Sequence, residues 1–428
     1  MNGARSSVRI VTVQTMSSGI QPRTSTLSNG LQLITERNEG QKSASFCWLI
    51  PGGVAHDPLD RGDGWASMIS EYLLRGSGNL TSREFSEALD RIGARRSVIA
   101  DSYFIRTSVT VCGENIAPAI SLFVRMVLDA HFAPDVIDPV RSLSMQELNG
   151  LDDDPSQQSI IRLDSIRLPK PFDRHGLGSA DHIMATTSQD LKDHFMKVAR
   201  PGGSIFSAAG DIHHDDIMEQ LEKELSDWKG STDLPVADGD PIGGTTHLER
   251  ATSQSHVVMG FDAPLASDSH AMGFQIAAGI LGGGASSRLF TEVRERKGLA
   301  YSIGGRFEPG KSIGNYTISA GTTPERMAET LECIDSVLSS FIDEISDEDI
   351  QRIRVQLRSG ILMQLEHGPA RARRLAFDHF RRGEAKSMES LLQDYINTSN
   401  DEVRRIASSY MGPEWRSKST RSIVGPAF

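Results

Sequence analysis

Apolar and polar positions recur with two different periods along the first half of the chain. A β-hairpin is predicted around Asn29-Gly30, between TSTL and LQLITE, because Asn-Gly favours the tight turns that join antiparallel strands. Continuous or alternating apolar runs predict strands over 43–50 and 105–111. Helical spacing of apolar residues predicts helices over 63–76, 81–92 and 116–130.

The second half repeats this order of elements. Strands are predicted over 256–264 and 315–321, and helices over 270–281, 286–298 and 324–341. The segment SREFSEALDRIGA (82–94) also aligns with SRLFTEVRERKGL (287–299). Ser82, Arg83, Phe85, Glu87 and Gly93 match Ser287, Arg288, Phe290, Glu292 and Gly298, each 205 positions later. Gly113 and Gly321, 208 positions apart, end equivalent strands, so the sequence predicts a tandem duplication.

Chain length and segment composition predict two domains. A chain of 428 residues is too long for one ordinary core. We expect a loose arm over 1–22, a first domain over 23–230, a linker over 231–250 that is rich in Pro, Gly, Asp and Thr, and a second domain over 251–422. Strands and helices do not alternate strictly, which favours an α+β class with two homologous domains, each a mostly antiparallel sheet with helices packed on it.

Composition excludes several classes of function. The contents of 38% hydrophobic and 24% charged residues are typical of a soluble globular protein, and no apolar run approaches the ~20 residues of a membrane span. The net charge of −11 argues against nucleic-acid binding. The N-terminus lacks the apolar core of a signal peptide. Cys47, Cys112 and Cys333 are scattered, which favours reduced thiols in a cytoplasmic protein. The lack of a long apolar run predicts no membrane partner.

The segment 281–305, LGGGASSRLFTEVRERKGLAYSIGG, combines three glycines with Arg294 and Tyr301, seven residues apart. It resembles the second-half signature of the insulinase/pitrilysin-type zinc metallopeptidases, in the branch of mitochondrial processing peptidase and its short bacterial relatives. TLSNGLQLITE is similar to the first strands of that family, and QELNGLDDDP (146–155) is similar to the segment that holds its last zinc ligand. The resemblance spans Thr24 to Met411. It implies two domains arranged as half of a clamshell.

The zinc motif of that family is degenerate here. Active members carry His-x-x-Glu-His on a first-half helix, in which the two His bind zinc and the Glu is the general base. The resemblance places this motif on Ser67-Met68-Ile69-Ser70-Glu71, so both His and the base are absent. Glu147, 76 residues beyond Glu71, takes the position of the last ligand. Neither His-x-x-Glu-His nor His-Glu-x-x-His occurs in the chain.

We therefore expect this chain to bind no catalytic zinc and to hydrolyse nothing alone, since hydroxyls are weak zinc ligands. The resemblance implies that Arg294 and Tyr301 hold the substrate carbonyl and the developing oxyanion. The alternative is a surface arginine on a basic helix and a tyrosine packed at a strand start. Gly282, Gly283 and Gly284 resemble a substrate-binding glycine loop of the non-catalytic processing-peptidase subunit, or form a helix cap and turn that require positive φ.

The leading hypothesis is a non-catalytic subunit that completes the active site of a homologous partner carrying His-x-x-Glu-His. Zinc is then expected in that partner, and peptides or unfolded protein segments are the substrates. A catalytically inert peptide-binding or scaffold protein of the same fold is the alternative. A self-sufficient peptidase with an unusual metal at Glu71 and Glu147 is the third possibility.

The sequence also leads to expectations for His56, His213-His214 and Ser97. His56 is predicted to be a solvated loop residue, and His213-His214 a turn after a strand, with a metal site there as the minor alternative. Ser97 stands where active relatives usually have Asn, near an edge strand to which substrate backbones add. Its presence fits a first half that no longer binds substrate at a zinc site.

Overall fold

The computed structural model describes residues 21–428, apart from the side chains of Leu365 and Glu366; the predicted arm over 1–22 lies almost entirely outside this range. Two sheets form the framework, one from each half of the chain. The first has the order β1-β2-β8-β3-β7-β6, from Arg23–Thr26, Gln32–Arg37, Ile205–Gly210, Ser43–Pro51, Phe104–Cys112 and Arg95–Ala100. The second has the order β11-β12-β10-β13-β9, from Ser302–Pro309, Gly314–Thr322, Ser255–Asp262, Thr420–Gly425 and Thr245–Glu249.

The two sheets share one topology, as the duplication predicts. β6-β7-β3-β8-β2 corresponds to β11-β12-β10-β13-β9, with antiparallel pairing throughout except for one parallel pair in each sheet, β2 with β8 and β9 with β13. Strand β9 lies inside the segment predicted as a linker and is the counterpart of β2. Gly93 and Gly298, matched in the sequence repeat, have φ of 65° and 61°, so the repeated segments end in the same left-handed turn.

The hairpin at Asn29-Gly30 forms as predicted between β1 and β2, with φ of 94° at Gly30. The helices of the first half are α1 (Trp65–Leu73), α2 (Ser82–Arg91), α3 (Ile116–Leu128), α4 (Ile137–Gly150), α5 (Pro155–Arg167), α6 (Ala180–Ala185), α7 (Ser188–Val198) and α8 (His214–Glu224). Those of the second half are α9 (Ala271–Gly282), α10 (Met327–Ser340), α11 (Asp347–Glu366), α12 (Gly368–Arg382), α13 (Met388–Asn397), α14 (Asn400–Tyr410) and α15 (Pro413–Ser417). Among residues 21–428, no helix combines the length and apolar character needed to cross a membrane.

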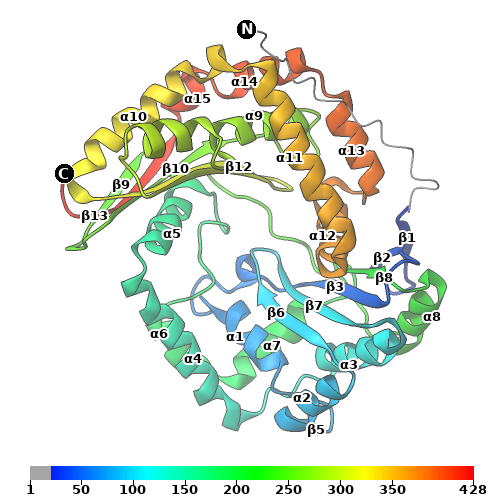
Figure 1. Ribbon diagram of the computed structural model, residues 1–428. Helices are drawn as coiled ribbons and strands as arrows, with labels where there is room; N and C mark the ends of the chain where they lie inside the picture. The colour runs from blue at the N-terminus through cyan, green and yellow to red at the C-terminus, as the bar shows by residue number, and fades with distance from the viewer. Residues whose placement is uncertain (1–20) are drawn as a thin grey trace.

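The two halves exchange one helix each. α5 packs on β10 and β13 of the second sheet, and α12 packs on β3 and β8 of the first sheet. Figure 1 shows both helices between the two sheets, on the faces that the sheets turn toward each other. The opposite faces carry the larger apolar clusters, centred on residues such as Trp48 and Phe274.

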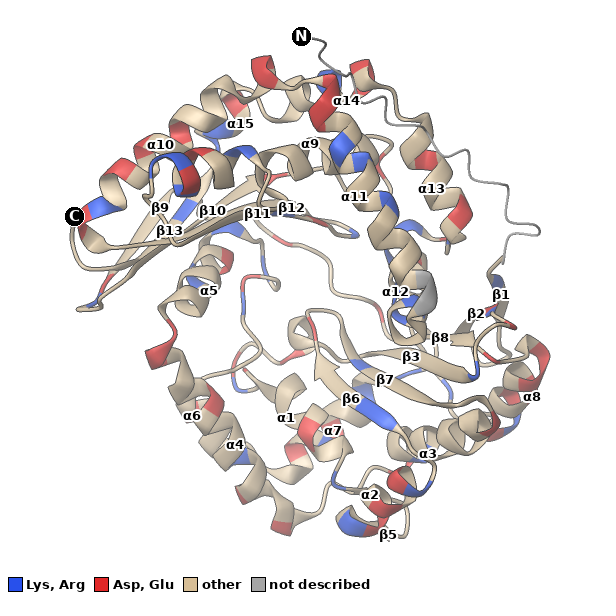
Figure 2. Cartoon of the chain, in the orientation of Figure 1, with Lys and Arg blue, Asp and Glu red and all other residues tan. Residues whose placement is uncertain are grey.

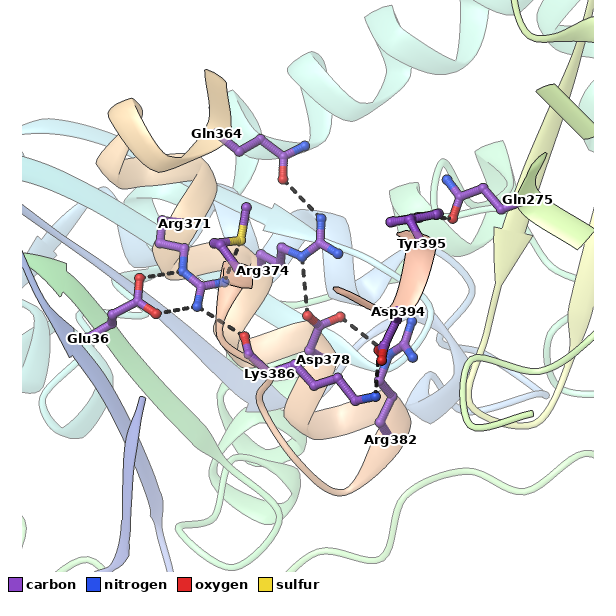
Figure 3. A network of polar contacts seen from close by, with 11 residues as sticks. Glu36, Gln275, Gln364, Arg371, Arg374, Asp378, Arg382, Lys386, Asp394 and Tyr395 are labelled. Atoms are coloured by element: carbon purple, nitrogen blue, oxygen red, sulfur yellow. Dashed lines mark hydrogen bonds and ion pairs between the residues drawn. The ribbon is translucent and has the colours of Figure 1, made fainter. Parts of the chain in front are cut away.

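Buried arginines fix both exchanged helices. The guanidinium of Arg371 on α12 binds both carboxylate oxygens of Glu36 on β2, and both side chains are at least 96% buried (Figure 3). Arg167 on α5 donates to Asn315 at 2.8 Å and to Asp262 at 2.9 Å, on strands of the second sheet. These paired guanidinium groups hold each helix in one position, because a buried charge without a partner destabilises the folded state.

Candidate functional site

Helix α1 carries the positions that correspond to the zinc motif. It begins after Gly64, whose φ of 94° permits the turn into the helix. The buried carboxylate of Asp57 accepts the backbone N–H of Ala66 at 3.0 Å, which satisfies one of the free donors at the helix N-terminus. The structure therefore keeps a well-anchored helix at this position although the metal ligands are absent from it.

The two serines of α1 are engaged with the protein itself. Ser67 donates its hydroxyl hydrogen to the backbone carbonyl of Gly176 at 2.6 Å, and Ser70 donates to Ala66 within the helix at 2.9 Å. A Cβ at Gly176 would lie 3.1 Å from the Ser67 hydroxyl, so the loop that contains Gly176 packs directly over Ser67. This loop takes up the space beside the position that corresponds to the first zinc ligand.

The two carboxylates at this site do not converge. Glu71 is half-exposed and lies 3.6 Å from the guanidinium of Arg75, one helical turn away. Glu147 on α4 is exposed to solvent. Within residues 21–428, no group of three or more His, Cys, Asp and Glu side chains is placed to hold a metal ion. The residues present do not fit a zinc ion.

A buried polar cluster adjoins the start of α1, and no pattern in the sequence predicted it. Nε2 of His194 lies 4.0 Å from Oδ1 of Asp57, and the His194 ring contacts Trp65 edge-on. Burial lowers the pKa of His194 to about 4, and burial raises the pKa of Asp57 well above its usual range. His56 belongs to this cluster, so the expectation of a solvated His56 is wrong: burial lowers its pKa too.

Arg294 lies on a helix of unusual winding. The segment predicted as an α-helix over 286–298 contains a π-helix over Phe290–Arg296. π-turns are rare and often occur at functional sites. The exposed guanidinium carbon of Arg294 lies 4.8 Å from the centre of the Phe290 ring, and no described carboxylate lies within ion-pair distance of it. By contrast, Arg296 on the same helix is paired with Glu292 at 2.6 Å.

Tyr301 directly precedes β11, and its side chain is 45% exposed. Its hydroxyl donates to Oε1 of Gln254 at 2.6 Å and lies 3.2 Å from Nε2 of His256. Partial burial raises the pKa of Tyr301, so the phenol keeps its proton at neutral pH. His256, on β10, has its pKa lowered by burial and raised in part by Asp154, the residue that caps α5.

Gln254 and His256 were not predicted as site residues. The sequence predicted only that His256 begins a strand. The structure therefore joins Tyr301 to two unforeseen partners in its own half. Among the described residues it shows no direct contact between Arg294 and Tyr301, whose roles stay predictions.

The three glycines after α9 differ in their surroundings. Gly282 is buried, and a Cβ there would lie 2.5 Å from the backbone nitrogen of Gly305 on β11. Gly283 and Gly284 are exposed. None of the three has positive φ, so the expectation that the turn requires left-handed glycines is wrong. Close approach of α9 to β11 explains Gly282 instead.

The remaining expectations concern His213, His214 and Ser97. His213 caps α8, and the buried His214 begins that helix, with its ring nitrogens bonded to Thr35 at 2.7 Å and Ser25 at 2.9 Å. These hydroxyl partners give His214 a structural role. Ser97 lies in the middle of β6, which is an edge strand of the first sheet.

Comparisons with known proteins agree with this fold. Residues 185–357 match the family model described as the peptidase M16 inactive domain. An uncharacterized zinc protease of Mycobacterium tuberculosis is 26% identical, covering 95% of this chain and 97% of the relative. One of Streptomyces coelicolor is 25% identical, with coverages of 94% and 89%.

Solved structures share the whole fold. A protease from Helicobacter pylori superposes with a TM-score of 0.86 at 20% identity, covering 96% of this chain and 100% of that chain. A peptidase M16 inactive domain from Pseudomonas fluorescens gives 0.81 at 18% identity, covering 95% and 98%. The chain therefore contains a peptidase M16 inactive domain over residues 185–357, and almost its whole length is similar to proteins named as zinc proteases. Its sequence contains no His-x-x-Glu-His motif.

Proposed function

We propose that this chain is the non-catalytic subunit of a two-chain zinc endopeptidase. In this proposal a homologous partner with His-x-x-Glu-His holds the zinc, and the present chain presents Arg294 and Tyr301 to the substrate. The observation that carries the proposal is the contrast between the two halves. The Ser67 hydroxyl is bonded to the chain's own backbone at Gly176, whereas Arg294 is exposed and unpaired among the described residues.

The two donors suit a developing oxyanion. A guanidinium and a protonated phenol both donate to a carbonyl oxygen, and such donors stabilise negative charge most where water is excluded. The aromatic ring of Phe290 supports the Arg294 guanidinium from one side and leaves its N–H groups available. The Tyr301 hydroxyl donates its hydrogen bond to Gln254, so a substrate oxygen would have to replace Gln254 as the acceptor.

A binding protein or scaffold without hydrolysis is the second candidate. The local bonding of Tyr301 to Gln254 and His256 favours it, since these contacts satisfy the phenol without any substrate. The unpaired Arg294 favours the first candidate, because a scaffold has no need for an exposed, oriented guanidinium. The cytoplasmic location expected from the sequence stays a prediction.

Purification of the tagged chain from its own cells tests the pairing. The proposal expects a second chain of similar length that carries His-x-x-Glu-His, in equal amount and with one zinc per pair. If the chain is isolated alone, and a homologue with the motif from the same cells does not bind it when mixed, the pairing is refuted.

A further inference from the structure

Helix α12 covers only part of the inner face of the first sheet. The apolar side chains of α12 pack on residues such as Cys47 and Leu49 of β3 and Ile205 of β8. The helix also contacts the start of β7, where Phe380 meets Phe104, and the rest of β7 together with β6 continues the same face beyond it. The register places Arg106 and Ser108 of β7 beside Leu49 and Cys47, so these side chains lie on that face.

Strand β6 completes this open surface. Its residues on the same face are Arg95, Ser97 and Ile99, because they pair with Thr110, Ser108 and Arg106 of β7. Ile99 is 47% exposed, and Arg95 is also exposed. Ile99 lies beside the half-buried Arg106, and an exposed large apolar side chain of this kind next to a charged group is typical of a surface that contacts another molecule.

Three arginines on this surface lack carboxylate partners. Among the described residues, neither Arg95 nor Arg373 has an ion pair or hydrogen bond, and Arg106 makes only a weak contact with Ser108 at 3.4 Å. Asp101 acts electrostatically on Arg106, but its Oδ1 accepts the backbone N–H groups of Tyr103 and Phe104, and no ion pair joins it to Arg106. We name Arg95, Arg106 and Arg373 the arginine triad.

The triad spans the width of the open surface. Cys47 stands beside Ser108, which pairs with Ser97, the middle residue of β6 on this face. Arg373 is exposed on α12, a helix that contacts both β3 and β7, and like Arg106 it acts electrostatically on the buried Cys47 thiol. Arg95 lies at one end of the face and Arg106 at the other.

The unpaired triad contrasts with its surroundings. The chain carries a net charge of −11, and Arg96, on the opposite face of β6, lies 3.4 Å from Asp90. We propose that the arginine triad binds an acidic peptide segment in extended conformation. This inference goes beyond the proposed pairing with a zinc-bearing chain, because it concerns binding by the single chain.

Strand geometry sets the spacing of the bound acidic residues. Arg95 and Arg106 are offset by four residues along paired strands, or about 13 Å at ~3.3 Å per residue. An extended peptide places residues i and i+4 on one side at the same separation. Acidic residues four apart match the two ends of the triad, and a residue between them, at i+2, meets Arg373.

Other occupants fit the surface less well. Residues 1–20 contain Arg5 and Arg9 and no Asp or Glu, so this segment is repelled by the triad. Nucleic acid would also be repelled by the net charge of −11, and Figure 2 shows acidic residues on helices of both halves of the chain. Single-stranded oligothymidylate is therefore used as a competitor, to test whether the surface binds nucleic acid.

Fluorescence anisotropy on the full purified chain tests the proposal. The probe is a labelled Thr-rich peptide with Glu at positions i, i+2 and i+4, compared with the same peptide carrying Gln at those three positions. The expected result is binding about tenfold tighter for the Glu peptide at low salt, a difference that added salt reduces. Arg95→Gln and Arg373→Gln, both at exposed positions, should each remove most of this difference.

Arg83→Gln on α2 is the matched control, because Arg83 is exposed but paired with Glu87, and it should leave the difference unchanged. Equal affinity for the Glu and Gln peptides would overturn the proposal. So would an equal loss with Arg83→Gln, or displacement of the peptide by oligothymidylate at lower concentration than by unlabelled Glu peptide.

Discussion

Ser67 donates its hydroxyl hydrogen to the backbone carbonyl of Gly176, 2.6 Å away, at the position that corresponds to the first zinc ligand of active relatives. The contact joins helix α1 to the loop that contains Gly176. Gly64 at the start of α1 packs as closely on Gly178 of the same loop, where a Cβ would lie 2.9 Å from the opposite Cα. The loop and helix therefore form one packed unit.

Restoring the motif should not restore the metal. The combined substitution Ser67→His, Ser70→Glu and Glu71→His supplies the family's residues, but the loop at Gly176 occupies the space beside position 67 and Glu147 is exposed. We expect no stoichiometric zinc by elemental analysis after dialysis. One tightly held zinc per chain would show that the loop does not block the site.

Substitution of the glycines after α9 should distinguish a packing role from a substrate-binding role. Gly282→Ala places a methyl group against the backbone of Gly305 and should destabilise the fold by about 1–3 kcal/mol. Gly284→Ala meets nothing within 4 Å and should stay within about 0.5 kcal/mol. Urea denaturation of both variants measures this difference. Similar stability of the two would contradict the packing role of Gly282.

The ion pair between the exchanged helix α12 and the first sheet should matter strongly for stability. Arg371→Met leaves the Glu36 carboxylate buried without its partner and should cost about 3–5 kcal/mol. Arg358→Met, at an exposed position of α11, is the control and should change the free energy of unfolding by about 0.5 kcal/mol or less. If Arg371→Met lowers the free energy of unfolding no more than Arg358→Met does, the ion pair does not hold the helix.

His194 should make the fold sensitive to mild acid. Its pKa is about 4 in the folded chain against a usual 6.5, so below pH 6.5 the unfolded chain binds a proton that the folded chain does not. The stability contributed by neutral His194 is complete above pH 6.5 and is lost as the pH falls toward 4.

Chemical denaturation of His194→Gln at several pH values checks this sign. Relative to the variant, the natural chain should lose up to about 1.4 kcal/mol per pH unit in that window. Asp57 is present in both chains, so its own titration largely cancels in the difference. Parallel pH profiles would contradict the buried, neutral His194.

Short-range patterns in the sequence predicted much of this fold. The Asn29-Gly30 hairpin, strands β3, β7, β10 and β12, and the repeat marked by Gly93 and Gly298 all appear, because turn residues and apolar periods act locally. Strand β9 was hidden in a stretch rich in Gly, Pro and Thr, since its pairing with β13 depends on residues far along the chain. The π-winding around Arg294 likewise has no periodic signature.

The site was only partly accessible to the same reasoning. The resemblance pointed to Arg294 and Tyr301, but Gln254 and the cluster of Asp57 and His194 emerged from tertiary packing. The arginine triad also required the sheet register, which places Arg95 and Arg106 on one face. Isolated charged residues in a sequence do not reveal whether their partners are present.

The proposed function requires Arg294 and Tyr301 to act on a substrate held at a partner's zinc site. The most direct measurement is steady-state peptide cleavage by the reconstituted pair, with kcat and KM determined separately. Arg294→Ala and Tyr301→Phe should each lower kcat about 100-fold to 1,000-fold with little change in KM and with the zinc content of the pair unchanged. Arg296→Ala, on the same π-helix, should leave kcat within about twofold. Turnover by both site variants equal to that of the Arg296→Ala pair would contradict the account.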